Sequence, residues 1–442
     1  MNCIRNFPAA ALLMASLTAL TAHGQTRAAS APASTASSQT VVLDQIVVTA
    51  TRTERKLDET PGTITAIDLE ELAPVNFGDV IKDQPLLSAP FTTSGTGNTA
   101  YQRSGYSSYN IRGIEGNRVL QQIDGIRVPD EFRLGGSELI GRDYLDPELF
   151  KRVEILHGSA SALYGSDALG GVVSFATKSP DDYLARTDRP FHLGYKTAWL
   201  SVNESVSHSA TIAAEAGSLS ALAVYTRRDG RETENNGTVA PNPEDWSSDA
   251  VLTKLVWKPA AAHRAEFALD YFTRAGVVET NNREVTVGTA TTTDLRTASD
   301  TERFRLSFAY TFRPAVTGSG WFDVFDVRAY TQDAGTRDRT RELINYNPPS
   351  AANGAFRDRN IATAFNNDTD GFSLAAVKSL GDAHRFAFGV EGSRTDTNKP
   401  WSSITTTQRT GTSYPIEPRM ADTQTDRLGA YLQDEFTFTL AG

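Results

Sequence analysis

Cysteine is almost absent from the sequence. The only cysteine is Cys3, and it precedes the first apolar run, so it cannot be the acylated residue of a lipoprotein. A chain without any later thiol can form no disulfide, no thiolate metal site and no cysteine nucleophile. The scarcity of cysteine also agrees with an oxidising compartment.

The sequence also lacks an excess of basic residues. Its 43 Lys and Arg residues are outnumbered by 53 Asp and Glu residues, which gives a formal net charge of -10. A general binder of phosphate backbones would carry the opposite sign. We therefore expect no nucleic-acid partner.

Long hydrophobic runs are absent beyond the N-terminus. Residues 1–24 combine Arg5, a short apolar stretch and the small-x-small tripeptide Ala22-His23-Gly24, which is typical of a secretory signal peptide. The alternative is a membrane anchor, but the apolar stretch is shorter than the ~20 residues that a spanning helix needs. We expect an exported protein without a helical membrane span.

Two short segments follow the predicted signal. Residues 25–43 are rich in Ala, Ser and Thr and have no periodicity, so they are predicted to form a linker. The next residues have the composition of a strand and end at the charged run 51–56. An isolated strand can pair with the edge of a partner protein, although it can also be the first strand of the next domain. The residues in question are Asp44, Gln45, Ile46, Val47, Val48, Thr49 and Ala50.

Residues 55–180 show mixed patterns that predict one compact α+β domain. Asp68 can cap a short helix that runs through Leu72, and residues 77–84 can form a second helix. Asp124 and Gly125 lie between apolar flanks, which is a strong hairpin signal.

Residues 190–442 alternate between apolar and polar side chains with the period of a β-strand. Phe304 and Leu306 share one face with other aromatic residues, whereas Arg303 and Arg305 share the other. The same alternation places Phe267, Leu269 and Tyr271 opposite Glu266 and Asp270. One face suits lipid and the other suits water. A soluble β-sandwich would alternate in the same way.

The lengths of the connections favour a membrane barrel over a sandwich. Short links alternate with long ones at residues 229–246, 276–299, 334–366 and 396–424, as in outer-membrane barrels with short periplasmic turns and long outer loops. The pattern predicts about ten strands that run up and down in pairs.

Three motifs carry a resemblance to a known family. They are the segment Tyr109-Asn110-Ile111-Arg112-Gly113-Ile114-Glu115-Gly116-Asn117-Arg118, the turn Ile123-Asp124-Gly125 and the segment from Val153 to Val173. Together they resemble the plug domain of TonB-dependent receptors, and residues 44–50 resemble that family's TonB box. The order of these pieces matches the family along the whole chain, which would correspond to its N-terminal portion.

The resemblance implies an α+β plug domain inside a transmembrane antiparallel β-barrel of 22 strands in the outer membrane of a Gram-negative cell, in contact with its lipid. It further implies that ligand binds between the plug apex and the outer loops, and that TonB pulls on residues Asp44 to Thr49. Arg112 would pair with a barrel carboxylate. His157 stands where the family commonly has a second arginine, and Ser159 stands where proline is usual. His157 is then either a pH-sensitive substitute or a hydrogen-bonded packing residue.

The run from residue 166 to residue 184 looks closest to the haem and haemoprotein branch of the family. This implies haem as the transported ligand, with ferric siderophores as the alternative and cobalamin behind both. Haem needs an axial His or Tyr, and the predicted apex carries three tyrosines that are either iron ligands or simple contact residues: Tyr101, Tyr106 and Tyr109. We expect no intrinsic cofactor, and the sequence assigns no metal ligands.

Other functions remain as alternatives. A non-transporting adhesin or a signalling receptor would use the same scaffold, but a signalling receptor carries an extra domain before the TonB box. No enzyme motif is present, because the segment around Ser159 fails the Gly-x-Ser-x-Gly pattern. Ten strands cannot close a 22-stranded barrel, and open edges in lipid are costly. We therefore expect a truncated or split reading frame that has no transport activity of its own.

Overall fold

The computed structural model describes the backbone of residues 47–48, 55–56 and 63–438. Shorter gaps fall at residues 73, 75–76, 83, 90, 93–104, 107, 135–137, 141, 235–236, 239–240, 282–283, 285, 316–319, 382 and 415–420. Residues from Gln45 onward form one compact unit. Among the described residues, no helix is both long and apolar enough to cross a membrane.

A five-stranded sheet forms the centre of the first region. Its strand order is β3-β12-β13-β8-β9, with β13 and β8 parallel and the other pairs antiparallel. These strands are β3 (Thr63–Asp68), β8 (Val119–Ile123), β9 (Ile126–Arg127), β12 (Phe150–His157) and β13 (Gly171–Thr177). The small elements around them are α1 (Leu69–Leu72), α2 (Phe77–Ile81), β4 (Leu87–Ser88), β5 (Phe91–Thr92), β6 (Gly105–Tyr106), β7 (Asn110–Ile111), η2 (Gly116–Arg118), β10 (Phe132–Leu134), β11 (Glu138–Ile140), η3 (Pro147–Leu149), α3 (Ser161–Tyr164), η4 (Ser166–Ala168) and α4 (Pro180–Leu184).

Two local predictions in this region are confirmed, whereas the helix predicted at residues 77–84 ends earlier, at Ile81. The carboxylate of Asp68 accepts hydrogen bonds from the backbone N–H groups of Glu70 and Glu71 at 2.8 and 3.2 Å, so it caps α1 as predicted. Asp124 and Gly125 have φ angles of 49° and 78° and join β8 to β9 in a tight hairpin. The sheet buries Val119, Ile123, Val153, Ile155, Val173 and Phe175 completely.

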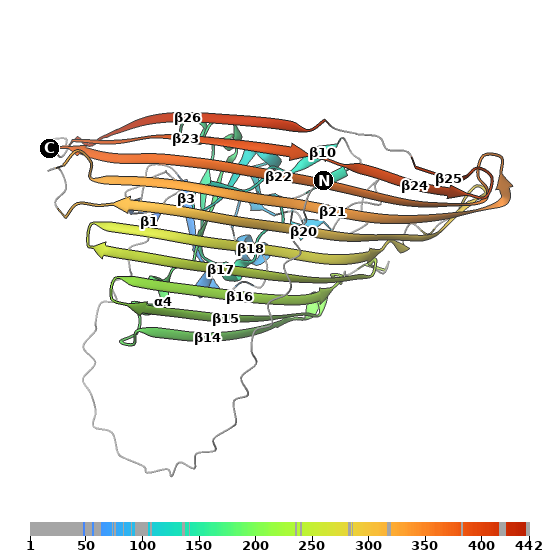
Figure 1. Cartoon of the computed structure of the whole chain (residues 1–442), viewed down its shortest axis with the longest axis horizontal. Helices are drawn as coiled ribbons and strands as arrows, with labels where there is room; N and C mark the ends of the chain where they lie inside the picture. The colour runs from blue at the N-terminus through green and yellow to red at the C-terminus, as the bar shows by residue number, and fades with distance from the viewer. Residues whose placement is uncertain are drawn as a thin grey trace, which may run out of the picture. The chain divides into compact units, whose positions relative to one another are not determined.

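A large antiparallel sheet makes up the rest of the described chain. Ten strands follow each other in the order β14-β15-β16-β17-β18-β20-β21-β22-β23-β26, which confirms the predicted number (Figure 1). They are β14 (Phe191–Leu200), β15 (Ser205–Ala216), β16 (Leu219–Arg231), β17 (Glu244–Ala260), β18 (His263–Glu279), β20 (Ala290–Phe312), β21 (Val324–Ser350), β22 (Gly354–Leu380), β23 (His384–Asn398) and β26 (Thr423–Phe436). Three short strands pair alongside: β19 (Thr286–Val287), β24 (Trp401–Thr407) and β25 (Gly411–Ser413). The 3-10 turn η5 (Ser201–Asn203) joins β14 to β15.

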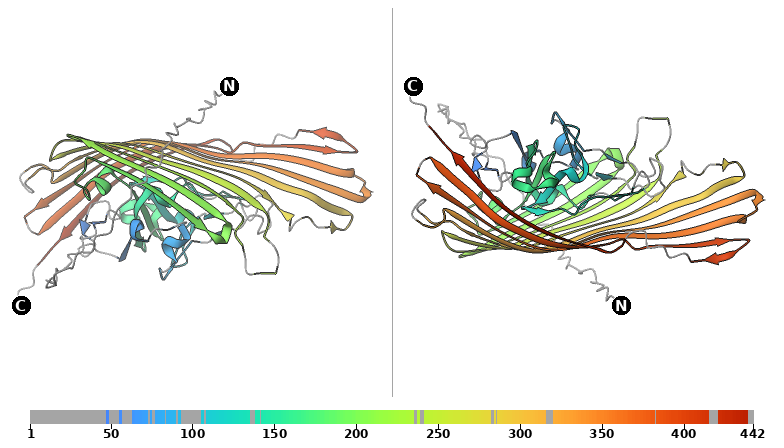
Figure 2. Two further views of the ribbon diagram at one scale, coloured as in Figure 1. Left: turned by 90° about the horizontal axis from the view of Figure 1, so that it is seen from below. Right: turned by 90° about the horizontal axis from the view of Figure 1, so that it is seen from above.

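The two faces of this sheet differ as the alternation predicted. The five-stranded region lies on the concave side of the large sheet (Figure 2). Arg303 and Arg305 are 0% and 2% exposed on that side, whereas Leu306 is 43% and Phe267 is 57% exposed on the outer side. The outer side carries further exposed apolar residues, including Leu193, Tyr195, Ile212, Leu255, Phe372, Leu374 and Leu432. The sheet therefore presents an apolar surface to its surroundings.

The predicted long connection at residues 334–366 has a different structure. β21 and β22 are 27 residues each and stay paired until the turn at residues 351–353. With β20, β24 and β25 they extend the sheet far beyond the first region (Figure 1). Polar residues such as Thr340 and Arg341 still alternate between faces there. A strand that is polar on both faces resembles a loop in composition, which explains the difference.

Candidate plug–barrel interface

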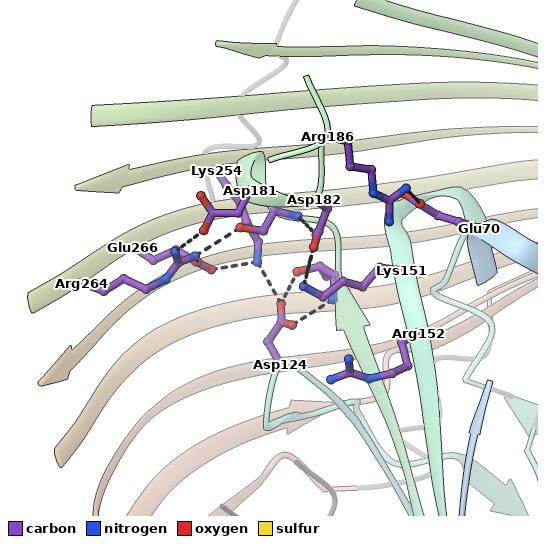
Figure 3. Close-up of polar contacts among 12 residues, drawn as sticks. Glu70, Asp124, Lys151, Arg152, Asp181, Asp182, Arg186, Lys254, Arg264 and Glu266 are labelled. Carbon is purple, nitrogen blue, oxygen red and sulfur yellow. Dashed lines mark hydrogen bonds and ion pairs between the residues drawn. The ribbon is translucent and has the colours of Figure 1, made fainter. Parts of the chain in front are cut away.

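The part of the chain that contains the five-stranded sheet, residues 63–184, is called the plug region below. Its last element, the short helix α4, precedes the first strand of the large sheet, β14. Ser179 and Asp182 form a capping box around its first turn, and Pro180 occupies a first-turn position. The carboxylate of Asp181 is therefore fixed toward the sheet, where it accepts a hydrogen bond from Arg264 at 2.9 Å (Figure 3). It also accepts a hydrogen bond from Lys258 at 2.8 Å. On the other side of α4, Asp182 lies 3.0 Å from Lys151 of β12.

Asp124 projects from the tight hairpin between β8 and β9 toward the large sheet (Figure 3). It accepts hydrogen bonds from the backbone N–H of Thr177 at 3.0 Å and from its hydroxyl at 2.6 Å. Lys254 and Arg305 of the sheet lie 3.9 Å away. Burial opposes the charged carboxylate, but the two cations and Thr177 outweigh burial and hold the pKa of Asp124 well below its usual value.

A buried group of charges lies on the sheet beneath this hairpin. Asp270 accepts hydrogen bonds from Arg303 at 2.6 Å and from Arg305 at 2.8 Å. Arg305 also donates to the backbone carbonyl of Ile123 in β8 at 3.0 Å. Because these guanidinium groups are almost fully buried, the Asp270 carboxylate is needed to keep them there.

Further ion pairs join the two parts of the chain. Arg228 binds Asp146, which also caps the 3-10 helix η3. Arg274 lies 2.9 Å from Asp143 and stacks over the indole of Trp246 at 4.6 Å. These contacts, together with those of Asp124 and Asp181, hold the plug region against the inner face of the large sheet.

The structure brings together the two residues that were predicted to contact the barrel. Arg112 lies in an exposed turn with φ 51°, and its charge acts on His157. The Nε2 atom of His157 is 3.0 Å from the hydroxyl of Thr65, which ties β12 to β3. Burial and the charge of Arg112 lower the pKa of His157. Between described residues no ion pair joins Arg112 or His157 to the large sheet, so their barrel contact stays a prediction.

Much of the predicted TonB box and apex lies outside the described residues. Asp44, Gln45, Ile46, Thr49 and Tyr101 belong to this part, and Tyr106 is described only as backbone in β6. Val47 and Val48 form β1 (Val47–Val48), which pairs with β2 (Arg55–Lys56).

The third tyrosine, Tyr109, has a different place from the one predicted. It is 5% exposed in the plug core, with its ring 6.2 Å from that of Phe175. We therefore do not propose that Tyr109 contacts ligand.

The sequence reasoning missed the plug carboxylates that make the interface. Alternation had placed Glu266, Asp270 and Arg305 on the polar face, but their partners needed the three-dimensional structure. Asp124 was recognised only as a turn residue, although a carboxylate at the tip of a buried hairpin is a signal for a cationic partner. Across the described residues no cluster of His, Asp and Glu has the arrangement of a metal site.

Comparisons with known proteins agree with this architecture. The family model TonB-dependent Receptor Plug Domain matches residues 56–172. The Hemoglobin-haptoglobin utilization protein B of Neisseria meningitidis is 34% identical over 205 residues, which cover 44% of this chain and 24% of that protein. The Hemin receptor of Yersinia pestis is 30% identical over 258 residues, or 58% of this chain and 36% of that protein.

A solved structure supports the same fold. The complex of P. aeruginosa FpvA with heterologous pyoverdines matches 89% of this chain and 52% of that chain, with a TM-score of 0.57 and 15% identity. The matched part therefore spans only about a quarter to a third of the curated relatives and about half of the solved receptor. Residues 56–172 therefore match the plug domain of TonB-dependent receptors, and the ten consecutive strands that follow are similar in fold to part of the barrel of such a receptor.

Proposed function

We propose that this chain forms the plug and the first part of the barrel of an outer-membrane receptor that imports haem, free or taken from a haemoprotein. Residues 1–24 would be removed during export. The observation that carries the proposal is the similarity to relatives named for haemoglobin–haptoglobin and hemin. The likeness to the pyoverdine receptor concerns the fold alone.

The energy for import is proposed to come from TonB. A barrel wide enough for haem leaks unless it is plugged, and the outer membrane must draw work from a partner. β1 and β2 pair through only two residues each, and an isolated two-stranded hairpin is marginally stable in water. A partner strand can therefore replace β2 beside Val47 and Val48 at little cost.

A proline substitution tests the TonB box. Val47→Pro removes a backbone donor from the segment, so we expect cells that carry the full-length variant to lose growth on haemin as the sole iron source while they still bind haemin. Thr35→Pro, in the predicted linker, is the matched control and should grow normally. Normal growth of the Val47→Pro cells on haemin would contradict the assignment of this segment as the TonB box.

A titration tests the ligand. Haemin added to the purified full-length receptor should shift the Soret band and saturate at one equivalent. Tyr101→Ala and Tyr106→Ala should change that spectrum if either tyrosine is an axial ligand. Saturable binding of a ferric siderophore with no haemin binding would replace haem by the siderophore alternative.

A further inference from the structure

The ion pairs that the structure describes between the plug region and the large sheet share one polarity. In each of the nine that the structure describes, the carboxylate comes from residues 63–184 and the cation comes from the large sheet. The pairs are Lys196–Glu148, Arg228–Asp146, Lys254–Asp124, Lys258–Asp181, Arg264–Asp181, Arg274–Asp143, Arg305–Asp124, Arg427–Asp130 and Arg427–Asp167. Pairs formed without a functional constraint on sign would include both polarities.

Six of these eight cations lie on four adjacent strands, β16, β17, β18 and β20, whereas Lys196 lies on β14 and Arg427 lies on β26. Arg274 and Arg264 lie on the same strand, β18, and ten residues of strand span about 33 Å. That length matches the ~30 Å hydrocarbon thickness of a bilayer. Lys254 and Arg305 lie between these ends, on the two neighbouring strands.

The inner face of the sheet keeps a net positive charge. Among the described ion pairs, the sheet carboxylates that pair with these cations are Glu244, Glu266 and Asp270. Three carboxylates are too few to neutralise the eight cations that face the plug and the additional cation Arg303. Arg303 Nε, Arg303 Nη1 and Arg305 Nε are buried and have no hydrogen-bond partner among the residues that the structure describes. When the plug carboxylates withdraw, the cations lose these partners and become available to water or to another anion that enters the space.

We propose that the inner faces of β16, β17, β18 and β20 form a cationic track for an anionic ligand, and that the plug carboxylates occupy this track in the resting state. When the plug moves, the ligand's anionic groups take the places of Asp124, Asp146 and Asp181. The track selects ligands with two or more carboxylates or comparable oxyanions. This inference rests on the proposed transport function, and haem with its two propionates fits the class.

A thiol-labelling experiment tests the track without any iron ligand. Ser248 lies between Arg228 and Arg274 in the sheet register, and the chain has no cysteine after Cys3. The full-length Ser248→Cys receptor is treated with an anionic and a cationic methanethiosulfonate in cells with and without TonB. Thr412→Cys, in the exposed strand β25, corrects for the intrinsic reactivity of each reagent.

If the track exists, the introduced thiol reacts rapidly only in cells with TonB, and the corrected rate of labelling is higher for the anionic reagent than for the cationic one. Arg274→Gln in the same background should reduce that preference. Equal rates, or a preference for the cationic reagent, would overturn the track even if haem uptake is normal. Conversely, a clear preference for the anionic reagent in a receptor that does not take up haemin would support the cationic track and would exclude haem as the transported ligand.

A matched pair of variants separates ligand guidance from plug retention. Asp124→Asn and Lys254→Gln both break the ion pair between these residues and should both loosen the plug, although Asp124 also faces Arg305 and Lys254 also pairs with Glu266. Only Lys254→Gln removes a group of the track. It should therefore lower the uptake of haemin relative to haemin dimethyl ester by about tenfold or more, as expected for one charge-assisted hydrogen bond. Asp124→Asn should leave this ratio unchanged. An equal change of the ratio in both variants would show that the pair only retains the plug.

Discussion

The buried pair between Arg228 and Asp146 should dominate the attachment of the plug. Arg228 Nε lies 2.5 Å from one carboxylate oxygen of Asp146, and Arg228 Nη2 lies 3.0 Å from the other. The two side chains are only 10% and 2% exposed. Asp146→Asn keeps the shape of the side chain but removes its charge and turns an amide donor toward the guanidinium.

Loss of one partner of such a buried pair costs about 3 kcal/mol at the lower end of the usual range. That value corresponds to about a hundredfold increase in the opening equilibrium of the plug. Hydrogen exchange of the full-length receptor in detergent measures this opening directly. The amides of β8, β12 and β13 should lose about a hundredfold of their protection, in line with that estimate, while those of the large sheet keep theirs.

The control is Asp426→Asn. Asp426 pairs with Arg394, and both side chains are 62% exposed, so water screens their interaction. This variant should exchange like the wild type. Wild-type protection in Asp146→Asn, or an equal loss in both variants, would refute the argument that buried ion pairs attach the plug.

Three further predictions concern the plug and the lipid face. The folded pKa of Asp124 lies below its ordinary value of 3.8, so the charged carboxylate stabilises the folded state above that pH, and this stabilisation is lost as the pH falls through the lowered pKa. The melting temperatures of wild type and Asp124→Asn should therefore converge only below about pH 4. Gly171→Ala should destabilise the plug more than Gly113→Ala. Both positions have positive φ, which costs a side chain about 1–2 kcal/mol, but only the new methyl at Gly171 meets a backbone atom, the carbonyl oxygen of Leu156, whereas Gly113 has open space; equal losses in thermal melts would exclude this contact. Phe267→Arg should lower barrel stability by about 2–4 kcal/mol if the site lies near the bilayer midplane. Val287→Arg in β19 is the control and should have little effect. Equal denaturation midpoints of the two variants would contradict the assignment of the lipid face.

The strands of the large sheet were predictable because their period is short. A few neighbouring residues are enough to assign the two faces of a strand, and burial follows from the face alone, as for Phe304, Leu306, Arg303 and Arg305. The hairpin at Asp124 was likewise predictable from adjacent residues. The extension of β21 and β22 was missed because its strands are polar on both faces, so no apolar stripe marks them.

The interface could not be predicted from sequence for a different reason. Arg228 and Asp146 are separated by 82 residues, and Arg305 reaches the carbonyl of Ile123 across 182 residues. No periodicity links such residues, because their proximity depends on how the plug sits against the sheet. The sequence predicted which side chains face the lumen, and the structure was needed to pair them.

Uptake of radio-iron-labelled haemin by cells that carry the full-length receptor, with and without TonB, tests the account most directly. If the receptor imports haem, the uptake is saturable, requires TonB and is lost in the Val47→Pro variant. Uptake that persists without TonB, or its absence in both strains beside normal TonB-driven uptake of another iron chelate, would contradict the proposed haem transport.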